Sequence, residues 1–346
     1  MIRIKDIARK ANVSTATVSY VLNNRGGVSE ETRQKVLKVI EELDYRPHPI
    51  AKSLKVKRTN TFGVVVEDIA VFNAPPIIDG INRFTDAHGL NLILTNMSLE
   101  KRVGRHYESP ESGRLAAKAI KDLIEKQVDG LIYIGVHPRD VTAMIPDIDK
   151  PIVFTYCYCT KPGIYSIHYD DEYGAYEATK YLLDRGHRRI GLISGPIDSI
   201  PAHDRFQGYM KALKERELPF HPAFVKIGDW EVESGYRLAK ELLAMDCSPT
   251  ALLAMNDVMA AGAMRACDEL GRSVPEEVSL IGFDNREFGA YLKPALTTMD
   301  LPLSELGNRC ARTLNALLNG QVPPLSPDDL AKPKCRLVER ESVGRL

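Results

Sequence analysis

The sequence predicts a small all-α head followed by a large two-lobed α/β domain. Capped helical stretches open the chain, and short apolar runs alternate with amphipathic stretches from residue 61 onward. The length of 346 residues is too great for one ordinary core. Hydrophobic residues make up 44% and charged residues 27% of the chain, a balance typical of globular proteins. We expect a head over 1–46, a linker over 47–60 and a large domain over 61–346.

Three short helices are expected in the head. The first covers 5–11, and Asn12 suits the left-handed conformation that ends a helix. Ser14 is a suitable N-cap for a second helix, and Ser29 for a third. Two short helices joined by a tight turn and braced by a third form a helix-turn-helix. The apolar positions of the three helices are Ile7, Ala8, Ala11, Val18, Val21, Leu22, Val36, Leu37, Ile40 and Leu43.

The outward face of the second helix can enter a DNA major groove, because its side chains are small or hydrogen-bonding. They are Thr15, Ala16, Thr17, Ser19, Tyr20 and Asn23. Residues 1–60 hold 13 Lys or Arg against 6 Asp or Glu, whereas the remainder holds 33 against 40. A basic head favours a polyanionic partner. A three-helix protein-interaction module would show the same caps and periodicity, so the helices alone leave both interpretations open.

The linker combines helix-ending prolines with a short basic segment. Pro47 and Pro49 end the third helix, and IAKSLK at 50–55 is too short to form a stable helix alone. Leu54 lies among several cations, which is the composition of a wedge that parts base steps in a minor groove. The alternative is an interdomain linker whose leucine packs against the larger domain.

The large domain alternates apolar runs with amphipathic stretches. Such alternation predicts parallel sheets covered on both faces, and about 285 residues of it indicate two lobes. The apolar runs are 61–66, 90–96, 129–135, 151–156, 189–195, 250–256 and 278–284. The amphipathic stretches include 77–88, 113–126, 173–185, 204–216, 232–245 and 257–270.

Polar side chains follow several of these apolar runs. Ligands of parallel sheets bind beyond the carboxyl ends of the strands, so these residues are candidates for a binding site. Helix capping is the alternative explanation for each of them. The residues are Glu67, Asp68, Asn256, Asp257, Asp284 and Asn285.

The head strings IKDIARKANVSTATVSYVLN, VSEETRQKVLKVIEELDYRP and IAKSLKVKRTNTFGVVV resemble the LacI/GalR family of bacterial regulators. The resemblance continues to about residue 340 through YLLDRGHRRIGLISG, AHDRFQGY, AMNDVMAAGAMRA, SLIGFDN and LTTMDLPLSELG. It implies a two-lobed core like that of periplasmic sugar-binding proteins. It also implies a homodimeric repressor that binds double-stranded DNA at a palindromic operator under the control of a small molecule, expected to be a sugar or sugar derivative.

The resemblance also implies which residues contact DNA. Thr15, Ala16 and Tyr20 become base-reading positions, and Leu54 becomes the intercalated wedge of a hinge helix. The full set of candidate DNA contacts is Thr15, Ala16, Thr17, Tyr20, Asn23, Ala51, Leu54 and Lys55. His48 and Pro49 depart from the family pattern, which puts a phosphate contact from position 48 in doubt.

In the large domain the resemblance implies that Arg205, Asn256 and Asp284 bind the effector, and these donors and acceptors suit a sugar. Trp230, the single tryptophan, can lie against a sugar ring, with simple packing as the alternative. Further candidate effector contacts are Glu67, Phe72, Asn73 and Tyr156. Tyr156 stands where relatives often carry an aspartate. The segment 99–113 is longer than is usual in the family and is expected to be an exposed loop, although Arg102, Arg105 and His106 are placed to approach the cleft.

Other functional classes find little support. The chain contains no P-loop, dinucleotide fingerprint, HExxH or GxSxG, and the Asp170–Asp171 doublet is a weak acid–base candidate. We expect neither an enzyme nor a cofactor or metal site. Six cysteines without metal-ligand spacing, a charged N-terminus and no long apolar run predict a cytoplasmic protein with reduced thiols, no signal peptide and no membrane span. A sugar-modifying enzyme and a soluble sugar-binding receptor are the alternatives, but a receptor would need a secretion signal and no basic head.

Overall fold

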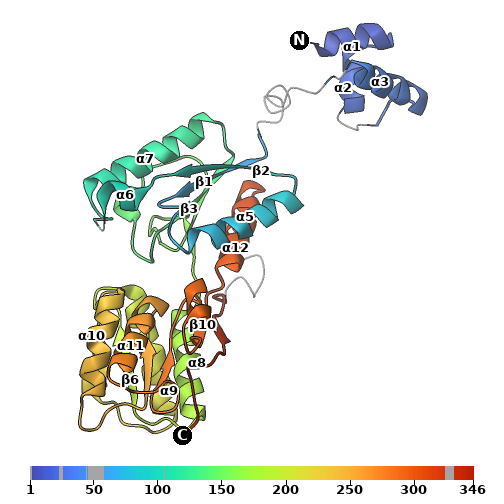
Figure 1. Ribbon diagram of the computed structural model, residues 1–346. Helices are drawn as coiled ribbons and strands as arrows, with labels where there is room; N and C mark the ends of the chain where they lie inside the picture. Colours follow the sequence, from blue (N-terminus) through green and yellow to red (C-terminus); the bar gives the residue numbers. More distant parts are fainter. Residues whose placement is uncertain (1, 23–25, 44, 46–57, 105, 324–330) are drawn as a thin grey trace. The chain divides into compact units, whose positions relative to one another are not determined.

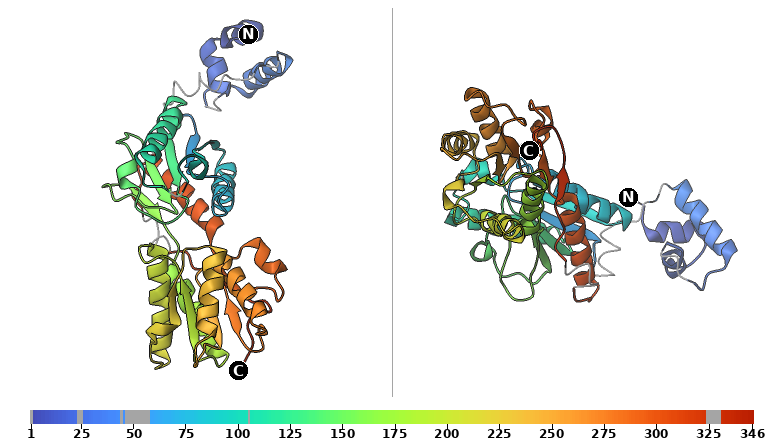
Figure 2. Two further views of the ribbon diagram at one scale, coloured as in Figure 1. Left: turned by 60° about the vertical axis from the view of Figure 1, so that its left-hand side comes forward. Right: turned by 90° about the horizontal axis from the view of Figure 1, so that it is seen from below.

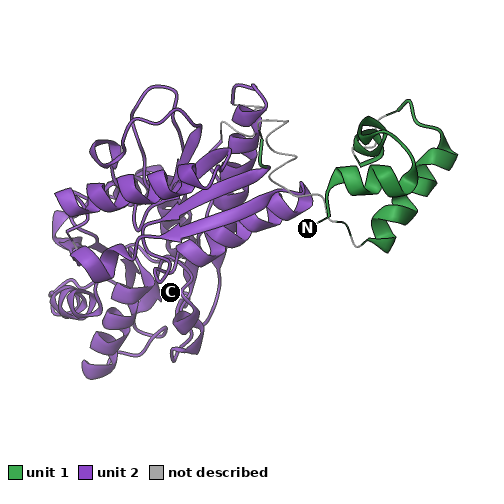
Figure 3. Ribbon diagram, turned by 90° about the horizontal axis from the view of Figure 1, so that it is seen from above, with its two compact units in different colours: residues 1–59 green, residues 60–346 purple. Residues whose placement is uncertain are grey.

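The computed structural model describes residues 2–22, 26–43, 45, 58–104, 106–323 and 331–346. The chain divides into two compact units, residues 1–59 and 60–346 (Figure 3). Nearly all of the expected linker, including Pro47, Pro49 and Leu54, lies outside the described residues. No helix in the described ranges is long and apolar enough to cross a membrane.

The head consists of three helices, α1 (Ile4–Ala11), α2 (Thr15–Leu22) and α3 (Glu30–Glu42) (Figure 1). Asn12 ends α1 in the left-handed region at φ 51°. The Ser14 hydroxyl accepts a hydrogen bond from the Thr17 amide at 3.0 Å, and the Ser29 hydroxyl accepts one from the Thr32 amide at 3.3 Å. The predicted helix end and both predicted N-caps are therefore confirmed.

The head core differs from the prediction at one position on α3. Val36 and Val39 are buried there, and Ile40 and Leu43 pack against them. Leu37, predicted as an apolar position, is 43% exposed. Successive helical residues are rotated by about 100°, so position 37 leaves the face that positions 36, 39, 40 and 43 share. The remaining buried head residues are Ile7, Ala8, Ala11, Val18 and Val21.

The first lobe of the large unit is built on a five-stranded parallel sheet in the order β2-β1-β3-β4-β5. Its strands are β1 (Thr61–Val66), β2 (Asn91–Asn96), β3 (Gly130–Ile134), β4 (Ile152–Thr155) and β5 (Tyr165–Ile167). Helices α5 (Ala74–Ala87) and α12 (Leu303–Leu318) pack against each other over one face. Helices α6 (Leu99–Val103) and α7 (Pro110–Glu125), with the 3-10 turn η1 (Thr142–Met144), cover the other face.

The second lobe is built on a four-stranded parallel sheet in the order β7-β6-β8-β9. Its strands are β6 (Ile190–Ser194), β7 (Val225–Ile227), β8 (Ala251–Ala254) and β9 (Ser279–Ile281). Helices α8 (Asp171–Asp184) and α9 (Ile200–Glu215) pack together, as do α10 (Val232–Leu243) and α11 (Asp257–Glu269) (Figure 2). An antiparallel pair, β10 (Thr298–Asp300) and β11 (Arg336–Val338), and the 3-10 turns η2 (Pro222–Phe224) and η3 (Glu287–Tyr291) complete it.

All seven predicted apolar runs form strands, and six predicted amphipathic stretches form helices α5 and α7 to α11. The sequence did not predict β5, β7, β10 and β11, which are three residues each and too short to show a period. It also did not predict α6, which begins the segment expected as a loop. Arg102 and His106 are exposed in that segment, as the loop prediction had it, and Arg105 lies outside the described residues.

Candidate functional site

A group of polar side chains in the large unit surrounds Arg205 of α9, which is 4% exposed. Its Nε donates to Asp171 Oδ1 at 2.7 Å, and its Nη2 donates to the Tyr169 hydroxyl at 3.1 Å. Its Nη1 donates to the carbonyl oxygen of Met255, just after β8. Three fixed acceptors therefore hold the guanidinium in one orientation at the carboxyl end of the second sheet.

Asp171 is the first residue of α8 and belongs to the Asp170–Asp171 doublet, a weak acid–base candidate in the sequence. Its neighbour Asp170 is the N-cap of α8, accepting from the Tyr173 amide at 2.9 Å. Burial raises the pKa of Asp171 above its ordinary value, and the charge and hydrogen bond of Arg205 act against that rise. The doublet is thus divided between a helix cap and a buried partner of Arg205.

Asp284 brings a second carboxylate to the same guanidinium. It follows β9 with φ 111°, and its Oδ1 lies 3.8 Å from Arg205 Nη2. Burial raises the pKa of Asp284 to about 8, Arg205 opposes the rise, and the carboxylate of Asp257 adds to it. No hydrogen bond from a described residue reaches the Asp284 carboxylate, so its oxygens remain available as acceptors.

Aromatic rings cover the guanidinium from two sides. Its Cζ lies 3.8 Å from the ring centroid of Phe283 and 5.8 Å from that of Trp230. Trp230 adopts a positive φ of 73° and is half-buried. Its indole lies against Gly195, where an added Cβ would overlap the ring. The predicted tryptophan is therefore held beside Arg205.

A cavity of about 110 Å³ opens next to Asp171. This volume has room for several water molecules, and the lining is mixed polar and aromatic. The lining residues are Pro138, Tyr156, Tyr158, His168, Tyr169, Asp171, Ile200, Asp204, Leu306 and Lys332. Of these, only Tyr156 was predicted as an effector contact, and Asp171 was considered only as a weak acid–base candidate.

Phe72 and Tyr156 of the first lobe add two further aromatic rings near the Arg205 group. The Tyr156 ring centroid lies 6.2 Å from that of Tyr169 and 6.5 Å from that of Phe72. The Arg286 guanidinium of the second lobe lies 4.4 Å from the Phe72 ring centroid. These two predicted residues are therefore brought close to the Arg205 group.

Asn256 has its side chain fully used within the protein. It is the N-cap of α11, where its Oδ1 accepts from the Met259 amide at 2.7 Å. Its Nδ2 donates to the Trp230 carbonyl oxygen at 3.0 Å. The Oδ1 atom therefore caps α11, as the alternative explanation had it, and the Nδ2 atom supports Trp230.

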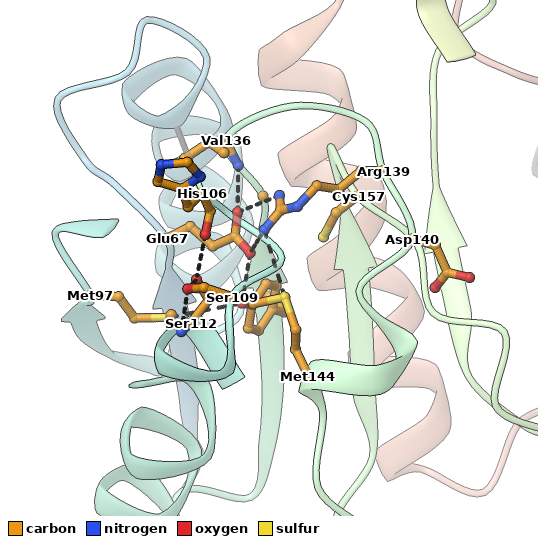
Figure 4. Close-up of polar contacts among 12 residues, drawn as sticks. Glu67, Met97, His106, Ser109, Ser112, Val136, Arg139, Asp140, Met144 and Cys157 are labelled. Carbon is orange, nitrogen blue, oxygen red and sulfur yellow. Dashed lines mark hydrogen bonds and ion pairs between the residues drawn. The ribbon is translucent and has the colours of Figure 1, made fainter. Parts of the chain in front are cut away.

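Glu67 and Asn73 also turn toward the protein. Both oxygens of the Glu67 carboxylate accept hydrogen bonds from protein donors, chiefly Arg139 (Figure 4). Asn73 Nδ2 donates to the Gly135 carbonyl oxygen at 3.0 Å, and its buried Oδ1 has no partner among the described residues. The sequence located Glu67 correctly at the end of β1 but did not predict the arginine that occupies it.

The predicted DNA-facing residues lie on the surface of the head. Thr15 and Ala16 are exposed, Thr17 is half-buried and Tyr20 is 44% exposed. Asn23, Ala51, Leu54 and Lys55 lie outside the described residues. Thr15, Ala16 and Tyr20 on the outward face of α2 are therefore accessible at the surface.

Comparisons with known proteins agree with this architecture. Residues 3–48 match the lacI family of bacterial regulatory proteins, and residues 179–343 match the periplasmic binding protein-like domain. The HTH-type transcriptional repressor PurR of Klebsiella pneumoniae is 36% identical over 347 residues, covering 99% of this chain and 97% of the relative. PurR of Escherichia coli O139:H28 is 37% identical over 349 residues with the same coverage.

Solved structures give the same result. The lac repressor dimer bound to operator and the anti-inducer ONPF has a TM-score of 0.76 at 29% identity, covering 99% of each chain. The complex of the transcriptional regulator CelR with cellobiose has a TM-score of 0.67 at 27% identity, covering 99% of this chain and 100% of the other. The capped head, the two α/β lobes and these matches along the full length lead to one assignment: the chain belongs to the lacI family of bacterial regulatory proteins and is a DNA-binding transcriptional regulator.

Proposed function

We propose that this regulator is a repressor that binds a palindromic operator as a homodimer and that a sugar or sugar derivative bound beside Arg205 controls it. One recognition helix reads few base pairs, and two-fold symmetry doubles the site. The lac repressor structure with operator is of a dimer, and the CelR structure holds cellobiose, which supports extending both properties to this chain.

The observation that carries the effector proposal is the acceptor-rich group around one fixed guanidinium. The side chain of Asp284 is 9% exposed and offers two carboxylate oxygens. Asp171 and Asp204 line the neighbouring cavity. A polyhydroxylated molecule supplies the hydroxyl donors that such carboxylates need. The faces of Trp230 and Tyr156 suit the C–H faces of a sugar ring.

The proposed contacts modify the sequence-based set. Arg205, Asp284, Trp230, Phe72 and Tyr156 remain ligand contacts, and Asp171 joins them. Asn256 acts through Trp230. Glu67 is assigned to the protein scaffold because Arg139 engages both of its oxygens, and Asn73 because it is 0% exposed and its Nδ2 already donates to Gly135.

A thermal-shift screen of mono- and disaccharides, sugar phosphates and purines tests this proposal. A ligand that binds only the folded state at about 100 times its Kd stabilises the protein by about 2.7 kcal/mol. We expect a saccharide to raise the Tm of the wild type and Asp284→Ala to remove that shift. If purines raise the Tm and no saccharide does, the ligand is a purine and not a sugar. If Asp284→Ala shows the same Tm shift as the wild type, the site is misplaced.

The cavity serves binding and not catalysis in this proposal. The saccharide that stabilises the protein should be recovered unchanged after prolonged incubation with it. Product detected by mass spectrometry, and absent with Asp171→Asn, would favour a sugar-modifying enzyme instead.

The proposed switch places the hinge at residues 47–60. The segment 50–55 is too short to be helical alone, so its helix forms where two copies meet on DNA. A ligand that moves the lobes changes their spacing and biases this order–disorder transition, which needs a coupling of about 1–3 kcal/mol. Leu54→Ala should weaken operator binding and shrink the effector response while leaving effector affinity unchanged. Full operator affinity and full response in that variant would make the hinge a passive tether.

A further inference from the structure

A buried ion pair lies beneath the loop that follows β3 (Figure 4). Glu67 is 0% and Arg139 is 5% exposed. The two terminal nitrogens of Arg139 donate to the two Glu67 oxygens, each at 2.8 Å. The Tyr133 hydroxyl and the Val136 amide add donations at 2.8 and 2.9 Å. The carboxylate is therefore enclosed by four donors from one stretch of chain.

The geometry of this ion pair fixes the position of the loop that carries Arg139 more than it stabilises the fold. Burying two charges costs desolvation free energy that their attraction only roughly recovers, so a buried ion pair is weak evidence for stability. A bidentate arginine, in contrast, fixes both the direction and the plane of its partner. Glu67 itself directly follows β1, an interior strand of the first sheet.

The backbone of the same loop is paired on its other side with Tyr158. The Tyr158 amide donates to the Arg139 carbonyl oxygen at 3.0 Å, and the Val141 amide donates to the Tyr158 carbonyl oxygen at 2.9 Å. Glu67 thus holds the loop 136–141 through the Arg139 side chain and the Val136 amide. Tyr158 holds the same loop through two backbone hydrogen bonds. Pro138, between these anchors, lines the 110 Å³ cavity, as does Tyr158.

Tyr107, from the longer segment at 99–113, lies against this network. The Arg139 Cζ lies 5.5 Å from the Tyr107 ring centroid, and the Tyr107 ring lies 5.0 Å from that of His137. Met144 places its sulfur 3.8 Å from Arg139 Nη2. The segment therefore contributes an aromatic ring that shields the ion pair from solvent.

We propose that Glu67 and Arg139 form a positioning pair that holds Pro138 and Tyr158 as the first-lobe wall of the cavity and so sets how a ligand fits. Neither residue contacts the ligand. The part that concerns ligand fit rests on the proposed effector site, whereas the placement of the wall does not.

Hydrogen exchange in the protein without ligand tests the placement. Arg139→Met leaves a buried carboxylate unpaired and is expected to fold poorly, so the decisive variant is the double change Glu67→Gln with Arg139→Met. The glutamine carries no charge, keeps its one carbonyl oxygen as an acceptor for the Val136 amide, and can donate its side-chain N–H to the Tyr133 hydroxyl oxygen. Arg114→Met is the matched control, because it removes an arginine–glutamate pair with Glu111 on the exposed surface of the same lobe.

We expect the double variant to retain the wild-type urea midpoint while the amides of Val136, Val141 and Tyr158 exchange about tenfold faster. Amides of β1 and of the second lobe should be unchanged, and Arg114→Met should match the wild type throughout. If the pair served stability alone, the double variant would show both the wild-type urea midpoint and wild-type exchange at these amides. A folded double variant with wild-type exchange at these amides would overturn the proposal.

Titration with cellobiose, followed by the emission of the single tryptophan Trp230, tests the fit. If the wild type responds, the double variant should bind about tenfold more weakly and Arg114→Met should bind normally. Equal affinities would overturn the claim that this wall sets ligand fit. If the wild type responds neither to cellobiose nor to any other saccharide, the sugar proposal fails, and the exchange measurement still decides whether the pair positions the wall.

Discussion

The indole of Trp230 lies so close to the Cα of Gly195 that a Cβ at position 195 would overlap the six-membered ring. Gly195 directly follows β6, so this contact fixes the ring at the carboxyl end of the second sheet, 5.8 Å from the Arg205 Cζ. The φ of Gly195 is not positive, so backbone conformation does not require a glycine here. The close approach of the indole does. The position of the predicted ligand-stacking ring therefore depends on the smallest side chain beside it.

Gly195→Ala should displace this ring. We expect a shift in tryptophan emission and a loss of effector affinity of about tenfold, the scale of one aromatic contact. Gly113→Ala is the control, because the nearest atom to an added Cβ there is 3.8 Å away. Fluorescence titration of the three proteins decides the matter. Unchanged emission in Gly195→Ala would mean that the ring has space to absorb the methyl group.

Effector affinity should rise with pH as Asp284 ionises. Burial raises the pKa of this carboxyl to about 8, and only the ionised form offers two full acceptor oxygens to ligand hydroxyls. Calorimetric titrations on both sides of about pH 8 should show tighter binding at the higher pH. In Asp284→Asn this part of the pH dependence should be absent, and a wild-type profile that is flat through this range would contradict the assignment.

The same carboxyl should make the ligand-free protein less stable at higher pH. Its folded pKa lies above the ordinary value of 3.8, so its contribution to stability is fully present below pH 3.8 and is lost as the pH rises through about 8. The Tm difference between Asp284→Asn and the wild type should therefore grow over this window. Differential scanning fluorimetry at a series of pH values measures it, and a constant difference would exclude Asp284 as the titrating group.

DNA binding should depend steeply on salt and specifically on Tyr20. A basic head that makes several phosphate contacts should lose roughly 10³-fold or more in affinity between about 50 and 200 mM salt. Tyr20→Ala should relax base preference, whereas Leu37→Ala, of nearly equal exposure but on α3, should not. Lys55→Ala should weaken all sequences alike. Fluorescence anisotropy on an operator and a scrambled duplex separates these effects, and salt-insensitive binding would reject the electrostatic account.

Stability of the first lobe should depend on two glycines where α5 and α12 cross. A Cβ on Gly307 would overlap the Ile77 carbonyl oxygen, and one on Gly80 would overlap the Ser304 carbonyl oxygen. Gly307→Ala should therefore cost about 1–3 kcal/mol or more in the free energy of unfolding, as overpacking does. Gly113→Ala, in α7, should be neutral or slightly stabilising. Urea unfolding gives both values, and a stable Gly307→Ala protein would show that the helices can separate.

Local signals in the sequence predicted the local structure well. Ser14, Ser29 and Asn12 behave as their chemistry dictates, because a cap or a left-handed residue acts within a few positions. The buried strands were predicted for the same reason, since their apolar runs need no partner to be recognised. The fold could therefore be predicted apart from the short helix α6 and the three-residue strands β5, β7, β10 and β11.

Side-chain pairing in the site could not be predicted in this way. Asp171 and Arg205 are 34 positions apart, and Glu67 and Arg139 are 72 apart, with no motif that links either pair. A polar residue at the end of a strand is placed near the ligand edge by topology, but its neighbours decide where it points. Asn256 and Glu67 lie at that edge and serve Trp230 and Arg139, respectively.

The closing of each lobe by a segment from far along the chain has a consequence for synthesis on the ribosome. Helix α12 completes the core face over β3 and β4, and Ser342 exchanges hydrogen bonds with Leu280 of β9. Neither lobe can cover its core until nearly the whole chain has emerged, whereas the head core is local and can form at once. A chain whose translation stops early would therefore carry a complete head core but two lobes with exposed apolar faces.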